Sequence, residues 1–572
     1  MKFKKNIPTI IGRLTYIVGL FDIFANIIRP FKLPAKRIDG YLPIFINSTA
    51  FATAVFTGLA LLILARGLTR KKRRARNLAI IILAINLASD LFRFHYHPLQ
   101  QLGAFLLLTL LILFRKEFYA ISDPTTKFAP IRAFIYSILV MLLFGLVVIY
   151  FRHGDQIVGK PSFANVLLTV VEGMVGITGP VRFASDRITD TVGVALAAFG
   201  IFTLIFPLWL FVRPIKPEPK MSEEELELVK SLVMRDEDQD SLGYFATRRD
   251  KSVIWSDNKK AGIAYRVQNG VMLASGDPFG EYSLWGETIE KFLAYSSLHA
   301  WTPAVMGASD RGGEVWVEKA NMLAVDIGDE AIINVSDFTL EGRPMGNVRN
   351  MVNRVKKAGY STYSSRFGDL TPQVQEQLRG LTKKWRYGVA ERGFSMSMDH
   401  FGEKIDNDAF ITVAEINGEA KGILYFVPWG KTKISLDRMQ RERGADSGLN
   451  ELMIAQTIAY ASEHGITHIS LNFAAFRSLL ERADKISAGP ITRTTRNLIR
   501  FASNWFQIES LYRFNAKFQP EWQTRYVIYP KASDLVRVGY SELRAEKFIS
   551  GFGKHKLRSG VGVVETFWSA IH

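Results

Sequence analysis

The sequence of 572 residues predicts an α-helical membrane domain followed by an α/β domain. Three observations support this expectation. Long apolar runs crowd the first part of the chain, a proline-rich segment follows them, and strand-like and helix-like patterns then alternate. The length fits two or three domains of about 100 to 200 residues each.

The composition is basic and free of cysteine. Lys and Arg number 72 against 54 Asp and Glu, which gives a formal net charge of +18. This excess favours a polyanionic partner, either a nucleic acid or an anionic lipid surface. The absence of cysteine excludes disulfides, thiolate nucleophiles and cysteine-ligated zinc.

The apolar runs of the first part are mostly close to the ~20 residues needed to cross a bilayer, so we expect about six spans. A short basic loop, RGLTRKKRRAR, joins the second and third runs, and a loop of this kind is expected in the cytoplasm. Counting crossings from it puts the segment after the last run in the cytoplasm as well. The runs cover residues 8–28, 41–65, 78–93, 101–114, 131–151 and 192–212.

Ionisable residues occur within or beside these runs. Arg13, Asp22 and Asp90 either mark a polar path or headgroup pocket, or lie near helix ends with their charges at the interface. His95 and His97 alternate as metal ligands can. No carboxylate or third histidine is close by in the sequence, so we assign them to an interfacial aromatic belt.

The segment RPIKPEPKMSEEE marks the domain boundary. Its prolines end the last apolar run, and Ser222 followed by glutamates predicts a helix N-terminus. The predicted division is a transmembrane domain over 1–215, a linker and entry helix over 216–240, an α/β domain over 241–550 and a C-terminal tail over 551–572.

The α/β domain is expected to contain a mixed sheet with helices on its faces. SVIWSD, GIAYRVQNGVMLASGDP and ITVAEINGEAKGILYFVPW have the patterns of strands, and the last is a hairpin whose Asn417-Gly418 pair suits a type I′ turn. A domain of ~350 residues exceeds the usual size, so two similar lobes are plausible. Helical patterns lie near 282–298, 345–358, 372–391 and 449–463.

One stretch predicts a strand (Lys433 to Asp437), a basic loop (Arg438 to Gly448), a helix (Leu449 to Glu463) and a strand (Ile466 to Phe473). A loop before a helix N-terminus presents backbone N–H groups and the positive end of the helix dipole, which suits a phosphate or a developing oxyanion. This is the layout of the acyl-CoA-binding core of N-acetyltransferase-like folds, although RERGAD only half matches their phosphate loop. A solvated basic loop is the alternative.

Several ordered motifs together carry a family resemblance. They are GDP (276–278), GRPMGNVRNMVNRVKKAGY, WRYGVAERGFSM, SLDRM with DSGLNEL, SLNFAAFRS and SLYRFNAKFQPEWQTRYVIYP. Over most of residues 240–530 the chain resembles the aminoacyl-phosphatidylglycerol synthases, also called lysyl-phosphatidylglycerol synthases or multiple peptide resistance factors. Two departures from the family pattern are Arg441, displaced by one position, and Ser447 in place of a proline.

The resemblance implies a polytopic membrane domain and a cytosolic domain of two N-acetyltransferase-like lobes. It implies an aminoacyltransferase that moves a lysyl or alanyl group from aminoacyl-tRNA to a headgroup hydroxyl of phosphatidylglycerol at the inner membrane face. The product would lower the negative charge of the membrane and give resistance to cationic antimicrobial peptides. No cofactor or metal is required in principle, because one ester replaces another. The oligomeric state is left open, and a homo-oligomer is possible.

The same resemblance implies roles for single residues. Asp437 is the candidate to take the hydroxyl proton or to grip the aminoacyl ammonium, unless it is a structural cap paired with Arg438. Arg438, Arg441 and Lys517 are candidates to stabilise phosphate or oxyanion. The candidate substrate-binding residues are Glu451, Asn472, Arg477, Arg513, Trp522, Arg525 and Asp277.

The segment RFNAKFQPEWQTRY interleaves basic and aromatic residues, which can hold phosphates and stack on an unpaired base of tRNA. The alternative is a strand and turn whose aromatic residues are core. Two other functions remain open: a CoA-dependent acyltransferase on the same fold, and a lipid translocator or scaffold with a regulatory cytosolic module.

Overall fold

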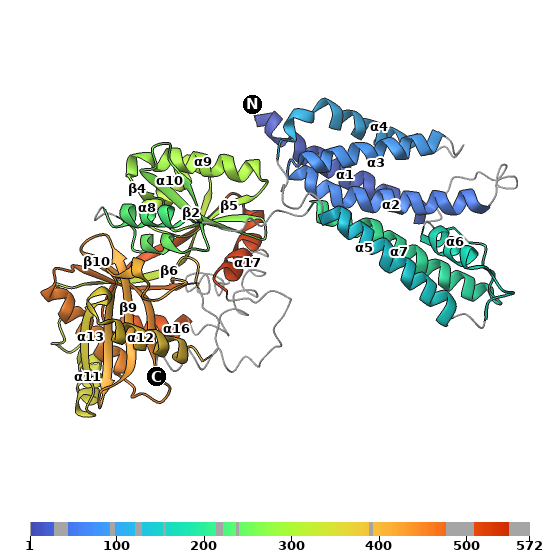
Figure 1. The fold of residues 1–572 in the computed structure, drawn as a ribbon. Helices are drawn as coiled ribbons and strands as arrows, with labels where there is room; N and C mark the ends of the chain where they lie inside the picture. The colour runs from blue at the N-terminus through green and yellow to red at the C-terminus, as the bar shows by residue number, and fades with distance from the viewer. Residues whose placement is uncertain are drawn as a thin grey trace. The chain divides into compact units, whose positions relative to one another are not determined.

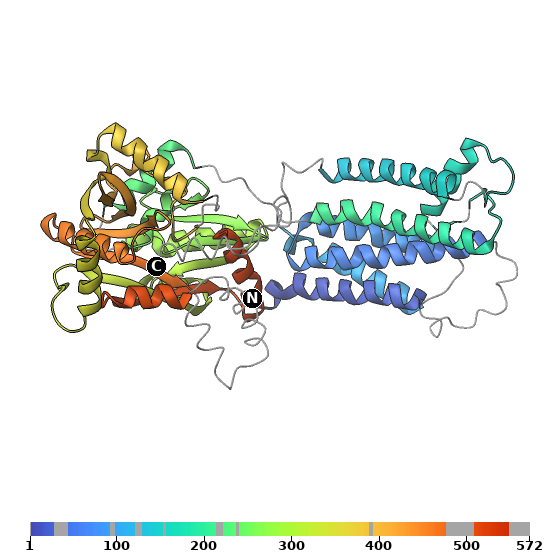
Figure 2. The same ribbon diagram turned by 90° about the horizontal axis from the view of Figure 1, so that it is seen from below.

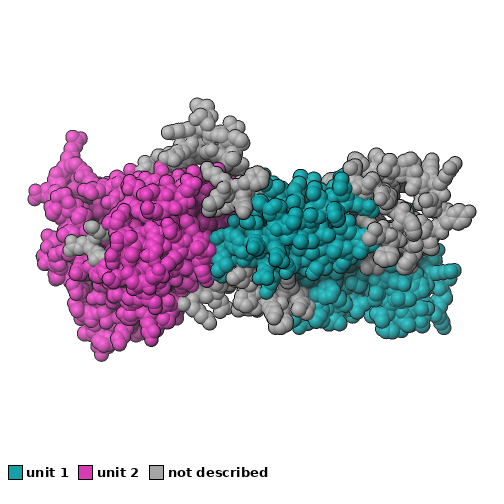
Figure 3. Space-filling view, turned by 90° about the horizontal axis from the view of Figure 1, so that it is seen from above, with its two compact units in different colours: residues 1–215, 297–300 teal, residues 216–296, 301–572 magenta. Residues whose placement is uncertain are grey.

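The structure is a computed structural model of the chain. It describes residues 2–27, 44–91, 98–120, 129–152, 156–174, 176–177, 179–212, 221–235, 239–387, 393–475 and 508–547. The chain divides into two compact units, shown in Figure 3: Met1–Ile215 with Ser297–Ala300, and Lys216–Ser296 with Trp301–His572. We refer to them as unit 1 and unit 2.

Unit 1 is helical, and Figure 2 shows its long helices lying side by side. A helix forms over each of the predicted apolar runs. Among the described residues, two helical segments are long and apolar enough to cross a membrane, residues 132–150 and 186–208. The helices are α1 (Lys2–Ile27), α2 (Ile44–Thr69), α3 (Arg73–Leu91), α4 (Pro98–Leu113), α5 (Ala129–Val147), α6 (Phe163–Met174) and α7 (Asp186–Val212).

The expectation of about six spans therefore stays a prediction. Residues 56–69, 101–113 and 163–174 form shorter apolar helices. The basic loop is a tight turn between α2 and α3, whereas His95 and His97 lie outside the described residues. Asp22 is buried within unit 1, at 1% exposure, and both roles that the sequence suggests for it stay predictions.

Unit 2 is built on one mixed sheet in which the strands follow the order β1-β2-β3-β5-β12-β6-β11-β10-β9-β8-β7, with β4 paired to β2. Among the described strands, β3–β5 and β10–β11 are the parallel pairs. The strands are β1 (Ser252–Trp255), β2 (Ala261–Gln268), β3 (Val271–Ser275), β4 (Phe279–Gly280), β5 (Thr302–Ala308), β6 (Leu323–Asn334), β7 (Ser361–Arg366), β8 (Phe410–Ile416), β9 (Glu419–Trp429), β10 (Lys433–Arg441), β11 (His468–Ala475) and β12 (Glu521–Tyr529).

Helices cover this sheet in two groups. Figure 1 shows α8, α9 and α10 around the strands of the first half, and α11, α12 and α13 around those of the second. The helices of unit 2 are α8 (Glu223–Val233), α9 (Trp285–Leu298), α10 (Asp310–Ala320), α11 (Gly346–Lys357), α12 (Pro372–Trp385), α13 (Leu449–Glu463), α16 (Ile508–Ala516) and α17 (Leu535–Ala545).

The two halves repeat one motif, because β3–α9–β5 and β10–α13–β11 are both strand–helix–strand units with parallel strands. This repetition agrees with the expected pair of lobes. The lobes do not have separate sheets, since β6 and β12 pair with each other over nine residues and join them. We call the halves the N-terminal and C-terminal lobes.

Alternation along the strands of the C-terminal lobe separates two cores. Ile434 and Leu436 of β10 pack with α11 and α13 on one face. Val427 and Tyr425 of β9 pack with α12 and Phe394 on the other. Side chains at β10 positions 435 and 437 alternate with Ile434 and Leu436, so they belong to the second face.

Local signals in the sequence explain several elements. Ser222 caps α8 in a reciprocal capping box with Glu225, as the sequence predicts. The β8–β9 hairpin turns at Asn417 and Gly418, whose φ angles of 53° and 75° are those of a type I′ turn. The predicted loop from Arg438 to Gly448 is wrong in its first part, because pairing with β9 continues β10 to Arg441.

Candidate functional site

The candidate site lies where β10 and β11 separate. These parallel strands pair only from Lys433–His468 to Ser435–Ser470. Beyond that point β10 continues to pair with β9, and the register of this pairing shifts between Leu436 and Arg438. β11 continues to pair with β6, and the register of that pairing shifts between Ser470 and Phe473. Asp437 and Asn472 therefore lie at the divergence of the strands.

Both side chains hold one loop, residues 393–401, which we call the site loop. Asp437 Oδ1 accepts hydrogen bonds from Met398 N at 2.7 Å and Ser397 Oγ at 2.9 Å. Asn472, with a φ of 66°, donates from Nδ2 to Leu436 O at 3.0 Å and Met396 O at 2.8 Å. The amide thus bridges the gap between the strands and the site loop.

Arg438 contacts the same loop. Its Nη2 donates to His400 O at 2.7 Å, and its guanidinium lies 5.6 Å from the Phe401 ring centre. Its Nε is 3.1 Å from Asp437 Oδ2, and the Asp437 side chain is 0% exposed. The structural pairing of Asp437 with Arg438 is therefore present, and direct proton transfer to Asp437 would displace either the site loop from Oδ1 or Arg438 from Oδ2.

A second cluster lies at the start of α13. Arg441 Nη1 donates to Ala445 O at 3.3 Å and Asp446 O at 3.1 Å, so its guanidinium orders the preceding loop. Burial lowers the pKa of Arg441, and the Glu451 carboxylate opposes that shift. Lys517 Nζ is 2.9 Å from Glu451 Oε1. Of this pair the lysine is the more accessible, with 30% of its side chain exposed against 5% for Glu451.

Glu451 changes what the helix start can bind. It lies in the first turn of α13, where a negative charge is stabilised by the helix dipole. Its buried carboxylate puts a negative charge where a bound phosphate would otherwise find the positive end of the dipole. The Glu451 carboxylate disfavours a CoA-type pyrophosphate at the helix start, whereas the more exposed Lys517 ammonium beside it still offers a positive charge.

Arg525 lies in a buried network between the lobes. Its guanidinium contacts Asp240 Oδ1 at 2.6 Å and forms an ion pair with Glu330. Glu330 also accepts a hydrogen bond from Ser470, the last β11 residue paired with β10. Arg525 is 1% exposed and its guanidinium is occupied by these acids, and its role in substrate binding stays a prediction.

Asp277 faces the same interior. Its Oδ1 accepts from Ser309 N at 2.9 Å, which fixes the N-cap residue of α10. Burial, together with the neighbouring Asp240 carboxylate, raises the pKa of Asp277 to about 7. With 7% exposure it is better placed to support the fold than to meet a substrate.

The remaining predicted residues do not join these clusters. Arg513 is exposed on α16, and Trp522 stacks on Tyr512 with ring centres 4.5 Å apart. This stacking agrees with the alternative that the aromatic residues of the segment pack on one another. Arg477 lies outside the described residues.

Comparison with known proteins identifies the family. The sequence model described as "Phosphatidylglycerol lysyltransferase, C-terminal" matches residues 230–529, which include both β10–α13–β11 and the site loop. The chain belongs to this family. It is an aminoacyl-phosphatidylglycerol synthase family member, as the sequence motifs predicted.

Curated relatives extend the match. The lysylphosphatidylglycerol biosynthesis bifunctional protein LysX of Rhodococcus opacus is 39% identical over 368 residues, which are 64% of this chain and 33% of the relative. The LysX of Mycobacterium avium is 34% identical over 536 residues, 91% of this chain and 44% of the relative. The chain thus spans a third to a half of the length of these relatives.

A solved structure supports the fold. The structure of L-PGS from Bacillus licheniformis aligns with 59% of this chain and 99% of its own, with a TM-score of 0.50 and 20% sequence identity. At that identity the similarity concerns the fold alone. It agrees with the mixed sheet of unit 2.

Several residues of this family member that hold the site were not found from the sequence. Glu330 interrupts the apolar, inward-facing positions of β6. An acidic residue at such a position was the signal by which the sequence could have indicated a buried polar network. His400 lies between Asp399 and Asp406, at 2.8 and 3.1 Å. Burial alone would lower the pKa of His400, but these hydrogen bonds raise it to about 10. No periodic pattern in the sequence indicates this cluster.

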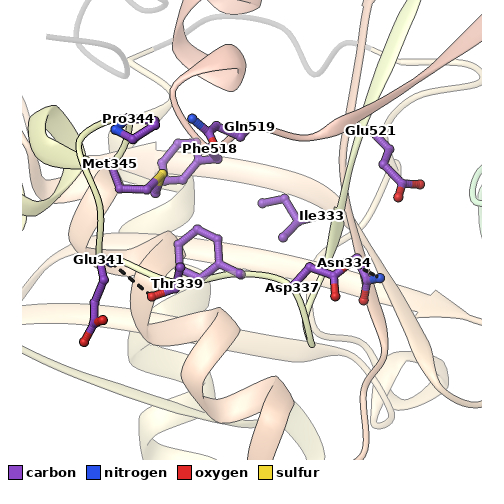
Figure 4. Close-up of a pocket in the computed structure, with 11 residues that line it drawn as sticks. Ile333, Asn334, Asp337, Thr339, Glu341, Pro344, Met345, Phe518, Gln519 and Glu521 are labelled. Carbon is purple, nitrogen blue, oxygen red and sulfur yellow. Dashed lines mark hydrogen bonds between the residues drawn. The ribbon is translucent and has the colours of Figure 1, made fainter.

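A separate pocket of about 190 Å³ lies at the end of β6. Figure 4 shows Phe518, Met345 and Pro344 on one side of it, with Asp337 and Asn334 across from them. Phe518 follows Lys517 in the sequence, but the lining contains none of the predicted site residues. We therefore place the candidate site at the strand divergence and the start of α13.

Proposed function

We propose that this protein transfers an aminoacyl group, lysyl or alanyl, from aminoacyl-tRNA to the headgroup hydroxyl of phosphatidylglycerol. The observation that carries the proposal is the convergence of Asp437, Arg438 and Asn472 on the site loop, within the family-matched region. The printed names of the LysX relatives support lysylphosphatidylglycerol as the product class.

The reaction exchanges one ester for another. The lipid hydroxyl oxygen attacks the carbonyl carbon of the aminoacyl ester and loses its proton, and the bond from that carbon to the ribose oxygen breaks. The ribose hydroxyl then takes a proton, so the equation balances. The site must supply orientation, a path for the proton and stabilisation of the tetrahedral oxyanion.

The structure favours different roles for the two clusters. Asp437 and Asn472 hold the site loop, so we propose that they orient the reacting groups through it. Lys517 is partly exposed and paired with Glu451, so we propose that its ammonium meets a substrate phosphate or the oxyanion, while Glu451 attracts the aminoacyl ammonium. Arg441 orders the loop that leads into α13.

We place the reaction at the cytoplasmic face of the membrane. Support comes from the apolar helices of unit 1 and from the basic turn between α2 and α3, whose arginines and lysines are expected on that side. In this proposal the protein is multi-pass, and its product makes the membrane less anionic and less attractive to cationic antimicrobial peptides.

Reconstitution tests the proposal. The full chain in phosphatidylglycerol vesicles receives radiolabelled lysyl-tRNA or alanyl-tRNA, with labelled acetyl-CoA as the control, and the lipid is then extracted. We expect label in the lipid from one aminoacyl-tRNA and none from acetyl-CoA. Lipid label from acetyl-CoA alone would contradict the proposal and support the CoA-dependent alternative.

A further inference from the structure

The site loop is held from two sides. On one side are Asp437 and Asn472, at the divergence of β10 and β11. On the other is Glu546, which directly follows α17 and is 1% exposed. Residues 393–395 are therefore held by a side chain far away in sequence, since 152 positions separate Phe394 from Glu546.

Glu546 binds the loop through both carboxylate oxygens. Oε2 accepts from Phe394 N at 2.6 Å. Oε1 accepts from Ser395 N and from Ser395 Oγ, both at 2.8 Å. The backbone adds a fourth contact, because Gly393 N donates to Glu546 O at 3.3 Å. Three donors on one ionised acceptor make a strong and directional hold.

The N-terminal lobe holds the Phe394 ring from its own side. Phe394 is 0% exposed, and Lys251 Nζ and the Arg266 guanidinium lie 4.8 and 4.9 Å from its ring centre. Lys251 is itself fixed by bonds to Phe245 O at 2.7 Å and Ser275 Oγ at 2.6 Å. Both the ring of Phe394 and the backbone at this end of the loop are therefore anchored.

A single residue, Met396, separates the Glu546 contacts from the Asp437 contacts. Ser395 is bound to Glu546, Met396 O to Asn472, and Ser397 and Met398 to Asp437. So short a segment transmits a displacement at its start to the residues that meet Asp437. Glu546 lies beyond residue 529, where the match to the family ends, so the family comparison assigns it no role.

We propose that Glu546 is a positioning residue for the transfer reaction, because it fixes residues 393–395 and thereby the register in which Ser397 and Met398 meet Asp437. This inference rests on the proposed function. It extends the site to the end of α17, outside the strand–helix–strand unit that carries the family motifs.

The decisive variant is Glu546→Gln. It keeps the size of the side chain but replaces one acceptor oxygen with an NH₂ donor, which would face the loop donors. Glu546→Asp keeps the charge and withdraws it by one methylene, and Ser395→Ala removes only the hydroxyl bond. The matched control is Glu542→Gln, which makes the same change one turn earlier on α17, at a side chain whose Oε1 has no hydrogen-bond partner.

Two measurements are made on the full chain in phosphatidylglycerol vesicles: initial rates against charged tRNA and lipid, and hydrogen exchange of the peptide containing residues 393–401. We expect Glu546→Gln to lower kcat by about ten- to a hundredfold, with KM changed less, since a small misplacement of reacting groups can cost that much. Exchange in the peptide should be faster, Glu546→Asp should recover part of kcat, and Glu542→Gln should match the wild type.

A wild-type kcat in Glu546→Gln would overturn the inference, and so would an equal loss of kcat in Glu542→Gln. If Glu546→Gln does not fold, Glu546→Asp and Ser395→Ala carry the test, and normal kcat in both counts against it. If the wild type itself transfers no label, the proposed function fails. Hydrogen exchange then tests the contact of Glu546 with the site loop without any activity. Unchanged exchange in Glu546→Gln would contradict that contact, and faster exchange would support it.

Discussion

At the scale of single residues, the buried acids of unit 2 differ in how they are compensated. Asp437 has hydrogen-bond donors on both oxygens, and Glu546 has three donors. Glu542 is 1% exposed and has an Oε1 atom without a partner. Burial, and then the charge of Glu546, raises the pKa of Glu542 to about 8.

This pKa shift predicts a pH-dependent stability. Below about pH 4.5 the Glu542 carboxyl is protonated whether the chain is folded or not. Between about pH 4.5 and about pH 8 the unfolded chain loses the proton while the folded protein keeps it, so this group makes stability fall as pH rises. Each pKa unit by which the folded and unfolded states differ changes the free energy of unfolding by about 1.4 kcal/mol.

We therefore expect Glu542→Gln to raise Tm over the wild type at about pH 8 and to leave it nearly unchanged at about pH 4.5. Thermal unfolding followed by tryptophan fluorescence measures this, with Glu290→Gln, an exposed position on α9, as the control. An equal Tm difference at both pH values would show that the Glu542 carboxyl does not titrate as described.

At the scale of elements, the start of α13 depends on one glycine. Gly448 is the N-cap residue and has a φ of 101°. A Cβ atom there would lie 3.0 Å from Val355 Cγ2 and 3.1 Å from Met351 Cβ, both on α11. Gly444, in the same loop, has a φ of 90° but no atom within 4 Å of such a Cβ. The two positions separate backbone strain from steric contact.

We expect both Gly444→Ala and Gly448→Ala to destabilise unit 2 through the left-handed backbone, by about 1 to 2 kcal/mol. Gly448→Ala should cost more, because α11 and α13 must also move apart, and it should lower transfer by displacing Glu451. Urea unfolding and transfer rates measure the two effects. Equal stability of the two variants would mean that α11 yields to the added methyl group without cost.

The sequence predicts local elements of this unit well and its long-range contacts poorly. Capping by Ser222, the turn at Asn417 and the bounds of α13 follow from residues that are close in sequence. The end of β10 was missed because pairing with β9 overrides the loop-like composition from Arg438 onward. Two features arise from contacts between distant segments: the inward orientation of Arg525 and the hydrogen bonds of Glu546 to the site loop. No motif in the sequence indicates either of them.

At the scale of the whole molecule, the net charge of +18 bears on how a polyanionic partner is recruited. Lys356 and Lys357 are exposed at the end of α11, whose neighbour Arg354 instead binds Ser447 at the start of α13. Lys356 and Lys357 make no ion pair among the described contacts, so their charges can contribute to the long-range attraction of a polyanion.

Under the proposed function, in which aminoacyl-tRNA is the donor, we expect the affinity for tRNA to fall steeply as salt rises, with a log–log slope set by the number of phosphates neutralised. Replacing Lys356 and Lys357 with glutamate should make the slope shallower and leave kcat at saturating tRNA unchanged. Filter binding over a salt series measures this, with Lys291→Glu on α9 as the control. An unchanged slope in the double variant would exclude the end of α11 from the tRNA interface.

The position of β12 has a consequence for synthesis of the chain. This strand is the last of the described strands in sequence, yet it lies in the middle of the sheet, between β5 and β6. Until Tyr529 has emerged from the ribosome, the strand pairing that joins the sheets of the two lobes cannot form, and the facing edges of β5 and β6 stay unpaired. Nascent chains of this protein should therefore need protection from aggregation late in translation, and a premature stop before β12 should leave the sheet interrupted between β5 and β6.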